Sequence, residues 1–241
     1  MTPAVATAAD RALEQAVLRA LDGVRDPELD EALPALGFVA RVTVAAGAAE
    51  VWLRLPTYYC AANFSFLMAA DAQRAAAAVP GVRSVKVVLQ DHYAADEINA
   101  GLAADTGFDA AFAGEGDGSG LEDLRLLFRR KAFLARQQRL CERLIAAGHT
   151  PEGLAGLTLA DLPADEDAAL YRSRRAELGL PMSPGAPLVV SPAGERVEAA
   201  AMAHQLRIGR MVKVSIEGNS GLCRGLLQTR YDLPQPTEVA A

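Results

Sequence analysis

Alternation of hydrophobic and polar residues marks three strands in the first part of the chain. The period of two, typical of a half-buried strand, runs through residues 38–44 and 50–55. The sequence Ala-Ala-Gly-Ala at 45–48 predicts a hairpin turn between these two segments. A third strand is expected over residues 82–90, directly after Pro80-Gly81.

Helical spacing of apolar residues predicts the helices that accompany these strands. Residues 9–24 form an amphipathic pattern, and from Phe64 to Val79 the apolar side chains again fall on one helix face. The first 90 residues therefore read α-β-β-α-β. We expect an α+β fold in which helices cover one face of a small mixed sheet, and in which the third strand lies parallel to the second. Within the first strand, Val39 is expected on the same face as Arg41 and Thr43, with Ala40, Val42 and Val44 on the other.

The composition of residues 114–120, Gly-Glu-Gly-Asp-Gly-Ser-Gly, is typical of a flexible linker. Ser119 and Glu122 match a capping box at the start of the helix that follows. We thus predict a domain over residues 1–113, a linker over 114–120 and an extension over 121–241. The extension is expected to be mainly helical with a few short strands: helices over 121–147, 165–178 and 197–208, a short helix after Thr150-Pro151, strands over 188–190 and 211–216, and a glycine-rich loop over 217–225.

Cys60 lies where the second strand gives way to a helix. Pro56 has no N–H to donate, so it ends the strand, and the helical pattern begins at Phe64. Cys60 is therefore expected in a loop at or just before a helix N-terminus, where backbone N–H groups and the helix dipole favour a thiolate. The alternative is that Cys60 is a small buried residue.

Composition excludes several classes of protein. The 241 residues carry a net charge of −6, which argues against a surface that binds nucleic acid over the whole molecule. No apolar run reaches the roughly 18 residues of a membrane span, and the N-terminus lacks signal-peptide features, so a cytoplasmic protein is expected. Three cysteines, an odd number, form no disulfide framework; they would be free thiols or metal ligands.

Several motifs, taken together, resemble those of one protein family. Asp26-Pro27-Glu28, Leu36-Gly37-Phe38-Val39, the hairpin strands, Cys60 and Pro80-Gly81-Val82 occur in the order and spacing of the SufT/PaaD-type iron–sulfur cluster assembly domain. The resemblance covers about residues 9–92 and places Cys60 at the reactive-cysteine position of that family. Tyr58-Tyr59 and Ala61 stand where the family usually has Pro-Gly and Pro. The two rings either bury Cys60 or shape a site for one partner. The long extension is similar to a variant found with multicomponent diiron monooxygenases.

The candidate ligands are Cys60, Asp26, Glu28 and His92 for a metal, with Cys223 as a second thiol. Two loop cysteines could share one metal, with His92 or His204 completing the set, although no metal-binding spacing supports this. Asp26 is alternatively an architectural residue that bonds backbone N–H groups of the Cys60 loop, and Glu28 a solvated one. Cys141 falls in an apolar helical stripe and is expected in the core.

The leading hypothesis is a non-enzymatic maturation factor. Cys60 would transiently hold iron or an iron–sulfur cluster and pass it to a client metalloprotein, such as a component of a diiron monooxygenase, while the extension binds that client. Because a cluster normally takes four thiolates, the remaining ligands must come from elsewhere, for example from a second subunit in a homodimer. One alternative is a chaperone or adaptor that holds no metal. The weakest alternative is a thiol-dependent enzyme, since no base or acid lies at a recognisable partner position.

Overall fold

The structure, a computed structural model, describes residues 7–112 and 121–233. The chain divides into two compact units: Met1–Glu122 together with Ser220–Ala241, and Asp123–Asn219. The predicted linker and the capping serine Ser119 lie outside the described residues. The predicted domain boundaries stay a prediction, but the two units group the residues differently from it, because those from Ser220 onward go with the first unit.

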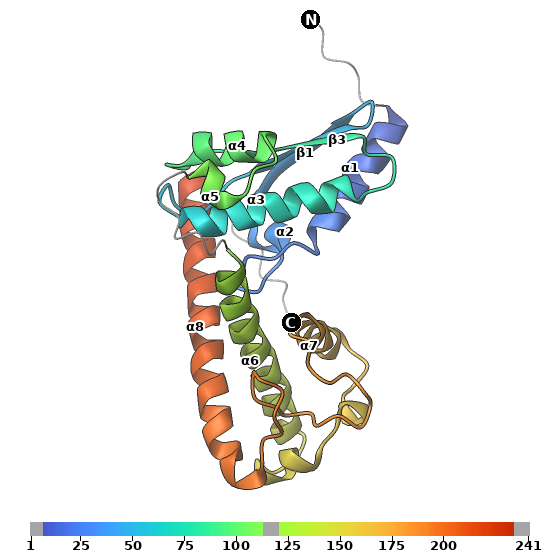
Figure 1. Ribbon diagram of the computed structural model, residues 1–241, viewed down its shortest axis with the longest axis vertical. Helices are drawn as coiled ribbons and strands as arrows, with labels where there is room; N and C mark the ends of the chain where they lie inside the picture. Colours follow the sequence, from blue (N-terminus) through green and yellow to red (C-terminus); the bar gives the residue numbers. More distant parts are fainter. Residues whose placement is uncertain (1–6, 113–120, 234–241) are drawn as a thin grey trace, which may run out of the picture. The chain divides into compact units, whose positions relative to one another are not determined.

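The first unit is built on a three-stranded mixed sheet (Figure 1). Strands β1 (Val39–Ala45) and β2 (Ala48–Leu53) are antiparallel, and β2 is parallel to β3 (Ser84–Leu89). Ala46 and Gly47 turn the hairpin with φ angles of 48° and 78°, the left-handed conformation that suits a two-residue hairpin loop. The α+β fold and the parallel crossover predicted from the sequence are confirmed.

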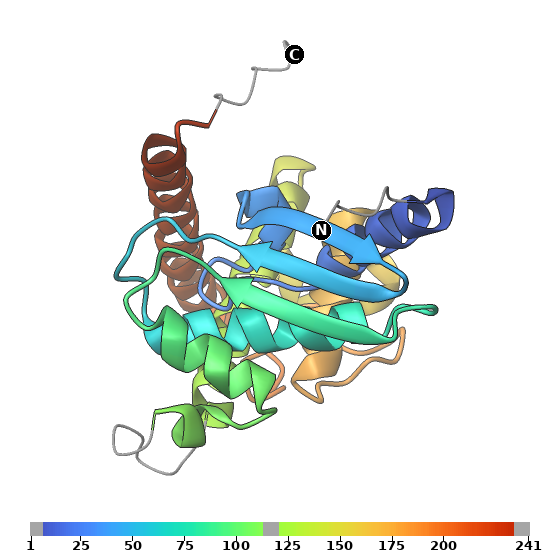
Figure 2. The ribbon, with the colours of Figure 1, turned by 90° about the horizontal axis from the view of Figure 1, so that it is seen from above.

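Two helices cover one face of this sheet. In Figure 2 the strands lie in front of α1 (Ala8–Leu21) and α3 (Ala62–Ala77). Three shorter helices complete the N-terminal part of the unit: α2 (Leu33–Leu36), α4 (Ala95–Ala103) and α5 (Phe108–Ala111). The buried core between sheet and helices includes Val17, Leu21, Val51, Leu53, Ala69, Ala72 and Leu89.

A bulge in β1 corrects one prediction about the sheet. Val39 pairs with Leu53, whereas Arg41 pairs with Trp52, so Ala40 is an extra residue in the ladder. The extra residue turns Val39 inward, against the core. The prediction that Val39 shares a face with Arg41 was therefore wrong.

The second unit has its own core. It contains α6 (Glu122–Ala146) from Asp123 on, two 3₁₀ helices (Glu152–Gly156 and Leu159–Asp161), α7 (Glu166–Glu177), and α8 (Ala199–Tyr231) as far as Asn219. Its core includes Phe133, Leu140, Cys141, Tyr171, Leu188, Val190 and Met202. Cys141 is fully buried, as its place in the apolar stripe of α6 predicted.

Residues 188–190 are not the strand that was predicted. The Gln137 side chain binds both backbone groups of Val190: its Nε2 donates to the Val190 carbonyl at 3.1 Å, and its Oε1 accepts from the Val190 N–H at 3.0 Å. The carbonyl of Leu188 accepts from the Tyr171 hydroxyl and from the Arg175 guanidinium. Backbone partners contribute single bonds here, from the Leu188 N–H to the Leu157 carbonyl at 2.9 Å and from the Val197 N–H to the Val189 carbonyl at 3.3 Å, so the segment makes an isolated bridge at Val190 and not a strand.

The predicted strand over 211–216 and the glycine-rich loop over 217–225 were also wrong, because both belong to α8. Buried or half-buried side chains recur at Ile216, Ser220, Cys223 and Leu227. This spacing of four, three and four residues is helical. A Cβ atom added at Gly218, Gly221 or Gly225 would meet nothing within 4 Å, so packing does not require glycine at any of these positions.

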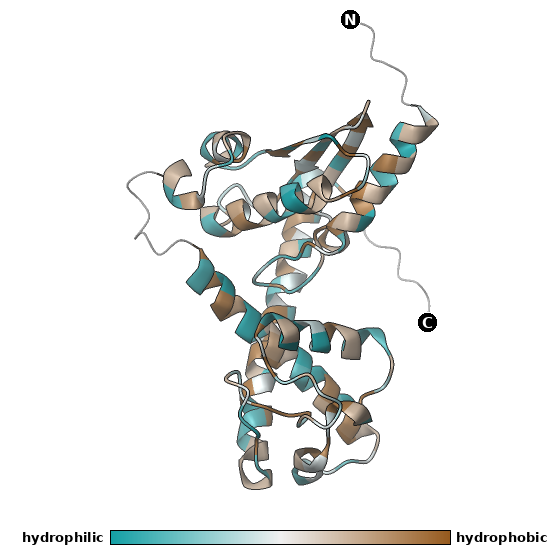
Figure 3. Cartoon of the chain, turned by 45° about the vertical axis from the view of Figure 1, so that its right-hand side comes forward, coloured by the Kyte–Doolittle hydropathy of each residue, from teal (hydrophilic) through white to brown (hydrophobic). Residues whose placement is uncertain are grey.

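In the described parts of the chain, no helix combines the length and apolar character needed to cross a membrane. Hydrophilic residues interrupt the long helices in Figure 3.

Candidate metal centre

The candidate site lies where the two parallel strands end. Because β2 and β3 run in the same direction, the segments that follow them, residues 54–61 and 90–94, leave the sheet at the same edge. Helix α3 begins at Ala62, and its N-cap Ala61 makes no side-chain cap. Cys60 therefore lies just before a helix N-terminus, as the sequence predicted; within the first turn, the Asn63 Oδ1 accepts from the Phe64 N–H at 2.8 Å.

His92 fixes the backbone of the cysteine loop. Its Nδ1 accepts a hydrogen bond from the Ala94 N–H at 3.2 Å, so the proton of the neutral ring is on Nε2. Nε2 in turn lies 2.7 Å from the Cys60 carbonyl oxygen and 3.2 Å from the Ser65 hydroxyl, which itself donates to the Ala61 carbonyl at 3.0 Å. Burial lowers the pKa of His92 and so favours this neutral form. Both ring nitrogens are engaged, so the geometry makes His92 a positioning residue behind the loop; it does not present His92 as a metal ligand.

The Cys60 thiol is half-buried, and its Sγ lies 3.4 Å from the Thr57 hydroxyl. The neighbouring rings do not cover it by turning inward: the side chains of Tyr58 and Tyr59 are 47% and 79% exposed. They contact each other edge to face, with ring centroids 5.0 Å apart, and Tyr59 stacks on Tyr93 at 6.0 Å. Three exposed tyrosines thus form one aromatic cluster in the two loops that frame the site. The sequence did not single out Tyr93; only its place after the end of β3 could have indicated it.

Asp26 organises the turn that precedes α2. Its Oδ1 accepts hydrogen bonds from the backbone N–H groups of Glu28 and Leu29, both at 2.8 Å. Asp26 thus has an architectural role, but within its own turn, and the prediction that it bonds N–H groups of the Cys60 loop was wrong. Burial raises the pKa of Asp26 to about 6, although these two hydrogen bonds oppose the shift.

The last turns of α8 bring Cys223 to the same place. Ser220 and Arg224 both bond to the Glu31 carboxylate, and Arg230 donates to the Leu55 carbonyl at 3.1 Å. These contacts hold the turn that carries Cys223 against both the 26–31 turn and the 54–61 loop. Views from two directions agree that the end of α8 lies beside the loops at this edge of the sheet (Figures 1 and 2).

Four of the candidate residues, Cys60, Cys223, Asp26 and Glu28, lie close enough to interact electrostatically. Burial raises the pKa of Cys223 to about 11, and the nearby negative charges of Asp26, Cys60 and Glu28 add to the increase. Cys60 and Cys223 also pack against the same hydrophobic core. His204 is not part of the group: it belongs to the second unit, where its Nδ1 lies 3.2 Å from the Arg207 guanidinium.

These side chains do not form a finished metal cage. Over residues 7–112 and 121–233, no three histidine, cysteine, aspartate or glutamate side chains converge well enough to hold an ion. The arrangement instead offers two thiols, with acidic groups nearby that favour a bound cation over a free one.

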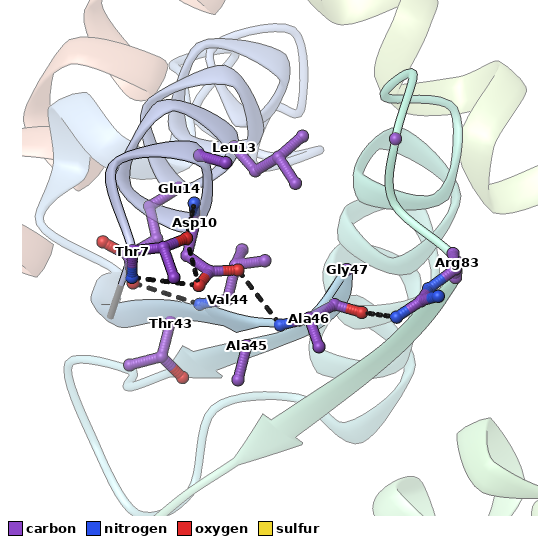
Figure 4. A pocket seen from close by; sticks show the side chains of 12 residues that line it. Thr7, Asp10, Leu13, Glu14, Thr43, Val44, Ala45, Ala46, Gly47 and Arg83 are labelled. Atoms are coloured by element: carbon purple, nitrogen blue, oxygen red, sulfur yellow. Dashed lines mark hydrogen bonds between the residues drawn. The ribbon is translucent and has the colours of Figure 1, made fainter. Parts of the chain in front are cut away.

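A hollow at the opposite end of the strands serves a different purpose (Figure 4). It lies between the start of α1 and the β1–β2 hairpin. Its two carboxylates already accept from backbone N–H groups of β1 and its turn: Glu14 accepts from Val44 at 3.1 Å and Asp10 from Ala46 at 3.0 Å. These bonds cover the free edge of β1, which would otherwise be open to pairing with another strand.

Comparison with known families finds a match within the first unit. Residues 14–87 match the family described as iron–sulfur cluster assembly protein. The match includes the Asp26 turn, the hairpin and Cys60, and it ends before Cys223. Comparisons with curated proteins and with solved structures found no match to this chain. The resemblance predicted from the motifs is confirmed: residues 14–87 form a domain of the iron–sulfur cluster assembly protein family.

Proposed function

We propose that this protein is an accessory factor that holds iron or an iron–sulfur cluster on Cys60 and passes it to a client protein. The observation that carries the proposal is the position of the Cys60 thiol, which is half-buried directly before α3, inside the segment that matches the assembly family. Cys223 is the second thiol of this proposed site.

The loop is suited to ligation followed by release. On binding metal a thiol loses its proton, and the N-terminus of α3 and the cation both stabilise the resulting thiolate. Asp26 and Glu28 add negative charge beside Cys223, which favours a bound cation. His92 holds the backbone of Cys60 still, so the sulfur is presented without prior rearrangement of the loop. An incomplete set of protein ligands leaves open positions through which a client thiolate can take over the metal.

Metal analysis of single variants tests this proposal. The full chain, Cys60→Ala and Cys141→Ala are purified anaerobically and incubated with ferrous iron and sulfide, and both elements are then measured. Cys141 is the matched control because it is buried in the core of the second unit. We expect wild type and Cys141→Ala to take up iron and sulfide equally, and Cys60→Ala to lose most of this uptake. Equal uptake by all three proteins, or by none, would contradict the proposed role of Cys60.

Transfer to a client is tested separately, with apo-ferredoxin as the acceptor. The loaded protein is mixed anaerobically with apo-ferredoxin, and the absorption spectrum of the acceptor is followed after the two are separated. We expect cluster to appear on the acceptor faster than from free iron and sulfide at the same concentrations. A loaded protein that retains its cluster throughout would favour storage over transfer.

The exposed tyrosine cluster favours a second candidate, an adaptor that binds a client without carrying metal. Tyrosines supply large contact areas at low entropic cost and are enriched at interfaces. On this alternative, Cys60→Ala would support client maturation as well as wild type does. We place a thiol enzyme below both candidates, because the His92 ring bonds to the Cys60 carbonyl and therefore does not act as a base toward its thiol.

We further propose that the second unit selects the client. It has its own core and lies outside the family match. It also exposes apolar side chains on α8, where Met211 is 69% exposed. Met211→Ser is therefore expected to slow transfer to the natural client while leaving iron and sulfide uptake unchanged. Equal loss of uptake and transfer would place the role of Met211 in folding.

A further inference from the structure

The number of thiols in the site is half of what a cluster needs. Clusters of the two common types, [2Fe–2S] and [4Fe–4S], are held by four cysteine thiolates. The first unit offers two, Cys60 and Cys223, and within the described residues no third cysteine, histidine or acidic side chain converges with them to enclose a metal. We propose that two copies of this chain hold one iron–sulfur cluster between them, each supplying Cys60 and Cys223. This inference rests on the proposed function.

Both thiols are placed to reach a partner. Each is half-buried, whereas Cys141, the remaining cysteine, is fully buried in the second unit. Contacts from α8 to Glu31 and Leu55 fix Cys223 against the loops that carry Asp26 and Cys60. These contacts fix both sulfurs in the same region of the first unit, so both would bind a shared cluster together.

A surface suited to a second copy adjoins these thiols. Tyr58, Tyr59 and Tyr93 are 47%, 79% and 48% exposed, yet they contact one another. The Tyr93 N–H donates to the Tyr58 carbonyl at 3.1 Å, and the His92 ring lies beside Tyr93, with centroids 4.8 Å apart. The rings are thus preorganised, which reduces the entropy lost on binding. A two-fold axis through the site would pack this patch against its own copy, as a symmetric dimer requires.

Charge makes the pairing depend on the cluster. The same axis would bring together the acidic groups of both copies, Asp26 and Glu28, which already act on Cys223 within one chain. Without a cation these charges repel. When a cluster binds, four cysteine S–H groups release four protons to solvent, and each thiolate displaces one small ligand, such as water, from iron. Four Fe–S bonds thus form as four iron–ligand bonds break, and no oxidant is needed when ferric and ferrous iron are both supplied. The iron ions then offset the negative charge, so loading and dimer formation are linked.

Molecular mass and metal content, measured on one sample, test the proposal. The full chain is incubated anaerobically with ferric and ferrous iron and sulfide, and apo and loaded forms are passed through size exclusion with light scattering. We expect the loaded form to be a dimer with one cluster for two chains, and the apo form to dissociate at least tenfold more readily. Cys60→Ser and Cys223→Ser should each reduce cluster content at least tenfold, whereas Cys141→Ala should leave it unchanged.

A surface variant tests the tyrosine patch without touching a ligand. Tyr59→Ala removes the most exposed ring and should raise the dissociation constant of the loaded dimer about tenfold, as for an interface hot spot. Leu18→Ala is the matched control, because Leu18 is an exposed apolar residue of α1 in the same unit. An equal effect of both variants would contradict this use of the patch.

The outcomes separate the two proposals. A monomer that carries a complete cluster or iron site overturns the shared site and leaves the proposed function standing. A dimer whose cluster content is unaffected by Cys223→Ser overturns the four-thiol scheme in the same way. Failure of wild type to take up iron and sulfide in any oligomeric state overturns both.

Discussion

Replacement of Asp26 by asparagine is expected to stabilise the first unit at neutral pH. The carboxyl group is buried, and its pKa in the folded protein is raised from 3.8 to about 6. Because the pKa is raised, the folded state favours the protonated carboxyl group. The contribution of Asp26 to the free energy of unfolding is therefore fully present below pH 4 and is lost as the pH rises through 6. A shift of about two units at about 1.4 kcal/mol per unit gives a loss of roughly 3 kcal/mol above pH 7. Asparagine has no charge to bury, and its Oδ1 can still accept from Glu28 and Leu29.

Urea unfolding at pH 4, 6 and 8 measures this effect, with fluorescence of the one tryptophan as the probe. Trp52 lies in β2, so the signal reports on the first unit. The stability gained by Asp26→Asn relative to wild type should grow by up to about 3 kcal/mol between pH 4 and pH 8. Asp10→Asn is the matched control of opposite sign, because hydrogen bonds from Thr7 lower the pKa of Asp10 and its ionised form stabilises the fold. A difference for Asp26→Asn that stays constant with pH, or that shrinks as pH rises, would refute the reasoning.

Three further outcomes are expected. Gly37→Ala should destabilise the first unit by about 1–2 kcal/mol in urea unfolding. The φ angle of Gly37 is +77°, and the new Cβ would lie 3.1 Å from a leucine methyl group of α8. Gly156→Ala is the control and should have little effect, because the space around Gly156 is open. Arg175→Met should lower the free energy of unfolding of the second unit by about 3 kcal/mol or more, because this fully buried guanidinium donates to three backbone carbonyls that would lose a partner. Circular dichroism in urea measures this loss, and an unchanged unfolding midpoint would contradict the prediction. The rate at which iodoacetamide modifies Cys223 should rise about tenfold per pH unit from pH 7 to 9, because the pKa of Cys223 is about 11. Cys141 is buried and should stay unmodified in the native protein. Peptide mass mapping measures both, and a rate for Cys223 that does not change with pH, or modification of Cys141, would contradict the prediction.

Local patterns in the sequence were sufficient to predict the sheet and the position of Cys60. The alternation around Val51 and Leu53 is a property of neighbouring residues, and so are the stop at Pro56 and the start of α3. The bulge at Ala40 could not be predicted in this way, since it depends on the register with the facing strand.

The part of the site that comes from α8 was not predictable from local pattern. Glycines at 218, 221 and 225 suggest a loop, because each costs about 1 kcal/mol in a helix interior. Packing of Ser220 and Leu227 against residues distant in sequence outweighs this preference. Cys223 was named as a partner of Cys60 because it was expected in a glycine-rich loop, whereas it lies in α8, and only the tertiary fold explains why this helix carries it to the cysteine loop.

The first unit is built from two segments of the chain, and the ribosome synthesises the whole second unit between them. Cys60 and Cys223 are separated by 163 residues, the difference of their numbers. At a synthesis rate of roughly 5–20 residues per second, the second thiol follows the first by roughly 10 to 30 s. The second unit, which ends at Asn219, is synthesised completely during that interval and can fold first. Both thiols are thus present only after residue 223 has been added, so a nascent chain that is shorter than this cannot present the complete cysteine pair.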